Sequence, residues 1–139
     1  NNADITAGGD DVSGISSNAP QTPAFYNCVN NGNITNTCIS LTTERLGGIF
    51  GYFGGTTKIT DCRTTGNVIG ASLDTKIGVI AGAPNNNPTV SGCSVGPCEV
   101  GLAGSTVTIT AENYVDYLRG SSDTKATNLN ATTVSFIAE

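Results

Sequence analysis

The chain has 139 residues, enough for one domain with a core, and contains 18 Gly, no His, Met or Trp, and only 12% charged residues. Its net charge of −5 repels phosphate groups and no basic cluster offsets it, which argues against nucleic acid and anionic membrane surfaces as partners. No apolar run approaches the roughly 20 residues of a membrane helix, so we expect no membrane insertion by this segment.

The first residues, NNADI (1 to 5), are similar to two later stretches of the chain, NNGNI (30 to 34) and TTGNV (64 to 68). The match places Ile5, Ile34 and Val68 at equivalent positions of a repeat. The chain therefore opens in the middle of a repeat. From this opening we expect the chain to be a fragment of a longer repeat-containing protein.

Three 17-residue segments align without a gap: VSGISSNAPQTPAFYNC (12 to 28), LGGIFGYFGGTTKITDC (46 to 62) and IGVIAGAPNNNPTVSGC (77 to 93). Four alignment columns are apolar or cysteine throughout: Val12/Leu46/Ile77, Ile15/Ile49/Ile80, Phe25/Ile59/Val90 and Cys28/Cys62/Cys93. Between these columns the residues are mostly Gly, Pro, Asn, Ser and Thr, which favour turns. Length differences fall in the linkers ITNTCISLTTER and VIGASLDTK, which we expect to be loops on one side.

Such repeats cannot bury their own apolar faces, but stacked copies can. The sequence therefore predicts an all-β fold, a short β-solenoid similar to a right-handed β-helix, of about three coils of 31 to 34 residues. The repeats lie near 12–34, 46–68 and 77–98. Because Ile59 and Cys62 are three residues apart, both can face inward only if the chain bends at Thr60 or Asp61.

The end of the chain departs from the repeat pattern. A one-residue deletion in SVGPC (94 to 98) would place Cys98 in the column of Ile34 and Val68. The run TAENYVDYLRG (110 to 120) predicts a helix that begins at Thr110, ends at Gly120 and covers the open end of the solenoid. Residues 121 to 139 are expected to form a partial coil, in which Ile137 of TVSFI takes the place of a cysteine.

The glycine-rich stretch GGIFGYFGG (47 to 55) has two interpretations, a phosphate-binding loop or a structural turn. A dinucleotide site needs its glycines between a strand and a helix, and a phosphate loop needs a following G-K-[ST]. Neither context is present. Because the segment recurs with different glycines retained, we favour the structural interpretation.

The five cysteines, Cys28, Cys38, Cys62, Cys93 and Cys98, cannot all pair within the chain because their number is odd. Without His or a C-x2-C motif we expect no zinc site. Recurrence in one column favours core packing of Cys28, Cys62 and Cys93. A disulfide that involves Cys38, or one between Cys93 and Cys98, is the alternative.

The GIFG stretch (48 to 51), with I-x-x-C-x-x-x-G-N-V (59 to 68) behind it, resembles the GLUG-motif repeats of surface-exposed and secreted bacterial proteins. The run from Thr108 to Gly120 resembles the helical insertion that follows such repeats in proteins of gut Bacteroidales. The resemblance implies an extracellular or cell-surface module, structural or adhesin-like, with no catalytic residues to carry over.

We therefore predict a non-catalytic module with no cofactor or metal, whose partners are other parts of a surface assembly or host and glycan ligands. Its binding surface would be the loops from Tyr52 to Thr57 and from Ala83 to Pro88, which recur on one side. The alternative is a carbohydrate-active β-helix, a lyase or hydrolase, which would require carboxylates to converge in a cleft beside an aromatic residue such as Tyr52. The candidate carboxylates are Asp61, Asp74, Glu99 and Glu112, with Arg63 beside Asp61.

Overall fold

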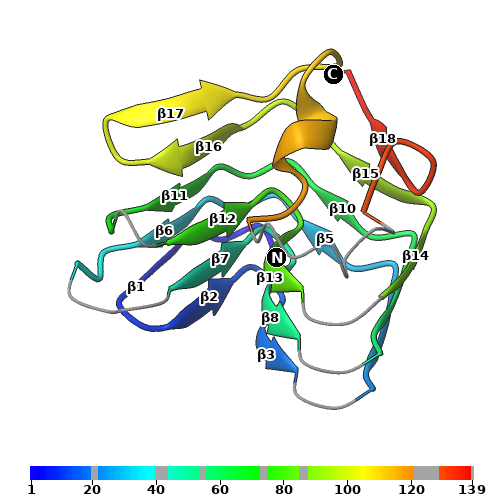
Figure 1. Ribbon diagram of the computed structural model, residues 1–139, viewed down its shortest axis with the longest axis horizontal. Helices are drawn as coiled ribbons and strands as arrows, with labels where there is room; N and C mark the ends of the chain where they lie inside the picture. Colours follow the sequence, from blue (N-terminus) through cyan, green and yellow to red (C-terminus); the bar gives the residue numbers. More distant parts are fainter. Residues whose placement is uncertain are drawn as a thin grey trace.

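The computed structural model describes residues 1–19, 22–39, 44–53, 56–72, 75–84, 88–120 and 129–138. Within these residues the chain winds through the same order of short strands three times, and each coil lies on the one before it (Figure 1). Equivalent strands of successive coils pair in parallel. The predicted all-β solenoid is confirmed.

Five sheets, named A to E in chain order, surround the core in the described residues. Sheet A contains β1 (Ile5–Ala7), β6 (Ile34–Asn36), β11 (Val68–Gly70), β16 (Glu99–Leu102) and β17 (Ser105–Thr108). Sheet B contains β2 (Asp11–Ser13), β7 (Arg45–Gly47) and β12 (Lys76–Gly78). Sheet C contains β3 (Ser16–Ala19), β8 (Phe50–Phe53) and β13 (Ala81–Pro84).

Sheet D follows with β4 (Ala24–Tyr26), β9 (Lys58–Thr60) and β14 (Thr89–Ser91). Sheet E contains β5 (Val29–Asn30), β10 (Arg63–Thr64), β15 (Cys93–Val95) and β18 (Val134–Phe136). The connection from sheet A to sheet B runs from 37 to 44 in the second coil and from 71 to 75 in the third. The difference in repeat length therefore lies in this connection, as the linkers predicted.

The predicted inward columns are stacked. Leu46 pairs in register with Val12 and Ile77, and Ile59 pairs with Phe25 and Val90. The amide of Ile15 donates to the carbonyl of Ile49, and that of Ile49 to Ile80. Leu46, Ile49 and Ile59 are at most 1% exposed, so the columns form the centre of the core. Like residues stack because parallel, in-register pairing places equivalent side chains on top of one another.

Two register predictions near the end of the repeats are wrong. Val100, not Cys98, pairs with Val68 in the column of Ile34. The third repeat has one extra residue at this point, not one fewer, and the extra residue allows Cys98 and Val100, two apart on an extended chain, both to face inward.

The other wrong prediction concerns the last strand. Val134, not Ile137, pairs with Cys93, and Phe136 pairs with Val95. Val134 and Phe136 alternate with an exposed serine, so the apolar face of β18 covers the top of sheet E. The partial coil beyond residue 120 is described only from residue 129, and there it supplies this strand.

The bend predicted at Thr60 or Asp61 lies at Asp61, which has a left-handed φ of 53°. Asn27 and Gly92, the equivalent residues of the other coils, have φ values of 53° and 63°. Asn, Asp and Gly tolerate this conformation better than other residues. The corner redirects the chain between sheets D and E, and it allows Ile59 and Cys62 to point inward on either side.

The glycines of GGIFG (47 to 51) are required by close backbone approach. A Cβ at Gly47 would lie 1.8 Å from the carbonyl oxygen of Phe50, and one at Gly48 would lie 2.3 Å from that of Val79. A Cβ at Gly51 would lie 2.6 Å from the carbonyl oxygen of Ser17. Sheets B and C therefore meet without space for side chains at this turn, and the glycines are structural.

The predicted helix over 110 to 120 is reduced to one turn of 3-10 helix, η1 (Tyr114–Tyr117). Past this turn the backbone pairs with the third coil: the amides of Val79 and Ile80 donate to the carbonyls of Tyr117 and Leu118. In an α-helix the Gly120 amide would donate to the carbonyl of Asp116, but here it donates to the Ala81 carbonyl at 3.0 Å, so the last helical turn is replaced by pairing with the third coil. Leu118 is fully buried above Ile80, so the segment does cover part of the upper end, as predicted (Figure 1).

Candidate functional site

The carboxylates proposed for catalysis lie in separate places. Asp61 is exposed at the corner between sheets D and E, Glu99 begins β16, and Glu112 precedes η1. Asp74 lies outside the described residues. Tyr52, the aromatic residue considered beside them, is on β8. The described carboxylates are not brought together by the fold.

The pKa values of Glu99 and Glu112 are also shifted in the wrong direction for a general acid. A hydrogen bond from Thr108 Oγ1 to Glu99 Oε1, 2.5 Å long, and a second from Thr106 lower the pKa of Glu99. A hydrogen bond with the Thr110 side chain lowers the pKa of Glu112. A general acid at neutral pH needs a raised pKa, so both groups are held in the ionised form.

The cysteine column crosses the interior at the start of sheet E. Cys62 and Cys93 are 2% and 1% exposed, and Cys28 is partly exposed at the first coil. The Cys62 thiol donates to the carbonyls of Thr60 and Phe25, at 3.4 and 3.7 Å, so it contacts its own coil and the coil below. Burial, followed by the neighbouring Cys62, raises the pKa of Cys28. Core packing is confirmed for Cys62 and Cys93.

All five cysteines have free thiols in this structure. The alternatives of a disulfide to Cys38 or between Cys93 and Cys98 are therefore not found in this state of the protein. Burial and the charge of Glu99 raise the pKa of Cys98 to about 12. No group of three or more Cys, Asp or Glu side chains among the described residues is arranged to hold a metal ion.

A polar cluster on the outer faces of sheets B and C is the strongest candidate for a binding surface, and we name it the Arg45 corner, formed by Asp11, Asn18, Arg45 and Tyr52. The Arg45 guanidinium contacts the Asp11 carboxylate twice, with Nε 2.5 Å from Oδ1 and Nη2 3.1 Å from Oδ2. Its Cζ lies 4.1 Å from the centroid of the Tyr52 ring. Asn18 Nδ2 donates to Asp11 Oδ2 at 2.9 Å.

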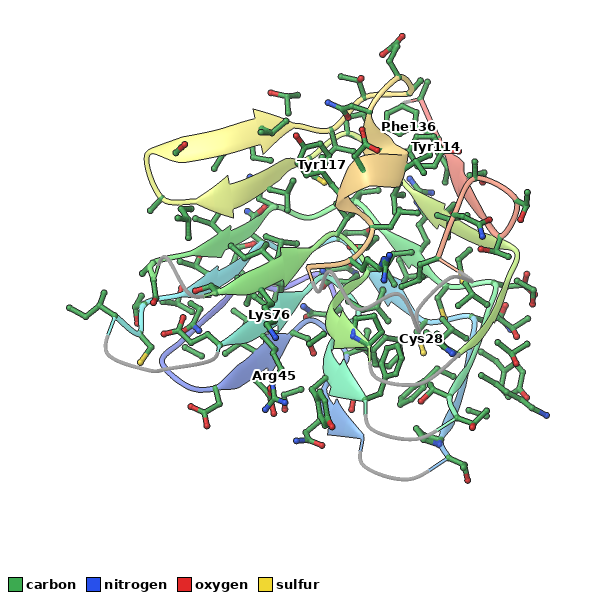
Figure 2. All side chains as sticks on the ribbon, in the orientation of Figure 1. Cys28, Arg45, Lys76, Tyr114, Tyr117 and Phe136 are labelled. Carbon is green, nitrogen blue, oxygen red and sulfur yellow. The ribbon has the colours of Figure 1, made fainter. Side chains whose placement is uncertain are left out.

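The stacking of coils creates this cluster. Arg45 pairs in register with Asp11 below it and with the exposed Lys76 above it, and Asn18 pairs with Tyr52 in the adjacent sheet. Figure 2 shows Lys76 directly above Arg45 in the view. The side chains of Asp11 and Arg45 are 11% and 23% exposed, so the ion pair is partly shielded from solvent. Partial burial and two-point contact fix the guanidinium in place.

Sequence reasoning missed the Arg45 corner, although one signal was present. Asp11 and Arg45 each precede an apolar residue of the first aligned column, so opposite charges had to stack once the repeat was recognised. The position of Tyr52 could not be read in this way, because its contact with Arg45 depends on the angle between sheets B and C.

The loops predicted to bind begin at stacked positions, because Tyr52 pairs with Ala83 and Phe53 with Pro84. Both return to sheet D in register, where the Thr89 amide donates to the Thr57 carbonyl at 2.8 Å. Residues 54 to 55 and 85 to 87 lie outside the described part of the chain. The two loops thus leave and re-enter on one side, as predicted, and the Arg45 corner adjoins the point where the first of them begins.

A separate hollow of about 330 Å³ lies between the β16–β17 hairpin, β12 and η1. Its wall is largely apolar and includes Ile77, Leu102, Val107 and Tyr117. The hollow lies where the repeat pattern ends, because β16 turns back into β17 and Gly120, which follows η1, lies against β12.

Within the described residues, no helix has both the length and the apolar character needed to cross a membrane. Comparison of the chain with protein-family models, with curated proteins and with solved structures found no match.

Proposed function

We propose that the chain is a non-catalytic module of an extracellular or cell-surface protein, structural or adhesin-like, that contacts its partner through an outer face of the solenoid. One observation carries the proposal: the residues that recur from coil to coil serve the fold. The repeated apolar residues are mostly buried, the repeated corner adopts the left-handed conformation, and the glycines permit close backbone contact. The repeat builds a scaffold, which leaves function to non-repeated outer residues.

The resemblance of GIFG and I-x-x-C-x-x-x-G-N-V to GLUG repeats supports the surface location. A carbohydrate-active enzyme is the weaker candidate, since Asp61, Glu99 and Glu112 are separated and the pKa values of both glutamates are lowered.

The Arg45 corner favours glycans as the partner class. A fixed guanidinium, a carboxylate and an amide supply donors and acceptors for hydroxyl groups, and Tyr52 adds an amphipathic ring. The net charge of −5 makes polyanionic glycans poorer ligands than neutral ones. We therefore expect neutral oligosaccharides to bind better than sulfated ones.

The experiment is a glycan-array screen of the full chain together with an assay of reducing-end release from polysaccharides. We expect binding of neutral glycans without release, and a loss of at least tenfold in affinity for Arg45→Ala. Lys58→Ala, which removes an exposed cation from sheet D, is the matched control. Release of reducing ends that Glu99→Gln or Asp61→Asn abolishes would overturn the proposal. Glycan binding unchanged by Arg45→Ala would move the contact surface elsewhere.

A further inference from the structure

The cysteine column places three thiols at the spacing of a parallel β-ladder. Arg63 pairs with Val29 and with Ser94, so the cysteines that precede these residues stack directly. Backbone hydrogen bonds hold both steps: the Arg63 amide donates to the Cys28 carbonyl at 2.8 Å, and the Ser94 amide to the Cys62 carbonyl at 2.9 Å. Neighbouring strands are about 4.8 Å apart, which is within the roughly 4.4–6.8 Å between the Cα atoms of native disulfides.

The three side chains also take the same orientation. Each thiol donates to the carbonyl two residues earlier, Cys28 to Tyr26, Cys62 to Thr60 and Cys93 to Ser91. Two steps of the ladder separate Cys28 from Cys93 by about 9.6 Å, which is too far for a bond. Cys62 can therefore bond to either neighbour but not to both, and one thiol of the column stays reduced.

Exposure decides between the two pairs. Cys62 and Cys93 are 2% and 1% exposed, whereas Cys28 in the first coil is partly exposed. An oxidant must meet an accessible sulfur first, and only the next sulfur in the column can complete the bond. This order favours Cys28 with Cys62 and leaves Cys93 as the spare thiol.

We propose that Cys28 and Cys62 form a redox-sensitive disulfide that clamps the first coil to the second when the protein meets a small-molecule disulfide such as oxidised glutathione. Cys28 loses its proton and attacks one glutathione sulfur, the glutathione S–S bond breaks, and one glutathione thiolate leaves and takes up a proton. Cys62, whose pKa is raised by its neighbour Cys93 and by burial, loses its proton in turn, attacks the Cys28 sulfur of this mixed disulfide and releases the second glutathione. Two protein thiols lose two electrons and two protons, and oxidised glutathione becomes two reduced molecules.

The clamp would join two coils that otherwise contact each other through packing and backbone pairing, as β2 does with β7, β3 with β8 and β4 with β9. The disulfide would close a loop from 28 to 62 and restrict the separation of these two coils. Oxidising compartments, such as those outside the cell, are where such a bond persists.

Peptide mapping tests the proposal because trypsin separates the cysteines. Cleavage after Lys and Arg leaves Cys28 and Cys38 in peptide 1–45 and Cys62 in peptide 59–63. The full chain with Cys38→Ser is incubated folded with oxidised glutathione, alkylated, digested and analysed by mass spectrometry. We expect peptide 1–45 linked to peptide 59–63, with a mass lower by two hydrogens than the sum of the reduced peptides.

Three variants in the Cys38→Ser background complete the test. Cys28→Ser and Cys62→Ser should remove the linked peptide, and Cys93→Ser should leave it unchanged, with circular dichroism confirming that each variant is folded. A link between peptides 59–63 and 77–119, which contains Cys93 and Cys98, would overturn the proposal. So would full alkylation of peptide 59–63 under conditions in which the same oxidant cross-links the urea-unfolded chain.

Discussion

The turn between sheets B and C offers the sharpest test of the packing, through the substitution Gly47→Ala. The new methyl group would lie 1.8 Å from the carbonyl oxygen of Phe50 and 2.8 Å from that of Ile80. Both neighbours are backbone atoms of stacked coils, so neither can rotate away as a side chain would. Overpacking of this kind costs about 1–3 kcal/mol, and a contact with backbone on two coils puts the expected loss near the upper limit, roughly 3 kcal/mol.

The loss is measured by urea and thermal unfolding followed by circular dichroism, since the chain has no Trp. For a chain of this size roughly 3 kcal/mol lowers Tm by about 10 °C. Gly9→Ala is the matched control, because a Cβ there meets no atom within 4 Å. It should unfold at or slightly above the wild-type midpoint, since alanine reduces the freedom of the unfolded chain. A Gly47→Ala protein as stable as the control would refute the close approach of sheets B and C.

Three further predictions concern the buried core residue Ile59, the left-handed residue Asp61 and the buried thiol of Cys98. Ile59→Ala should lose about 2–5 kcal/mol in urea unfolding, because Ile59 is fully buried, whereas Ile39→Ala, at a residue 78% exposed, should change stability by less than about 0.5 kcal/mol. Asp61→Val should lose roughly 1–2 kcal/mol because φ is 53°, and Asp61→Gly should unfold at the wild-type midpoint or above it. The pKa of Cys98 is raised from 9.0 to about 12, so its contribution to stability is complete below pH 9 and is lost as pH rises toward 12. The fall is at most about 4 kcal/mol, and Cys98→Ala, titrated beside the wild type, should remove it.

Much of the fold was predictable because stacked coils need similar residues at equivalent positions, and this need appears in the sequence as a repeat. Val12, Leu46 and Ile77 could be aligned by eye, and the structure pairs them in register. The bend at Asp61 followed from a conflict between the three-residue spacing of Ile59 and Cys62 and the two-residue period of a strand.

The wrong predictions concern the end of the repeats, where the sequence no longer follows the pattern that fixes the register of the earlier coils. Cys98 and Val100 are both apolar and two apart, so the sequence permits either in the column, and the extra residue before β16 decides for Val100. The helix predicted from 110 to 120 has suitable capping residues, yet the Gly120 amide donates to the Ala81 carbonyl of the coil below instead of closing a helical turn. Pairing with an existing sheet outweighs local helix preference here.

The candidate sites were less predictable than the fold. The stack of Cys28, Cys62 and Cys93 was expected from the alignment, but the difference in exposure that singles out Cys28 depends on its place in the outermost described coil. The Arg45 contact with Tyr52 depends on the angle between two sheets, which no single-column pattern encodes.

The parallel, in-register stacking of equivalent residues is tested most directly by nuclear Overhauser contacts between backbone protons of neighbouring coils. The account predicts cross-peaks from Ile59 to both Phe25 and Val90, which are separated from it by a full repeat. Cross-peaks that instead connect the 46–62 and 77–93 segments in antiparallel order, or their absence in a spectrum that resolves these residues, would contradict it.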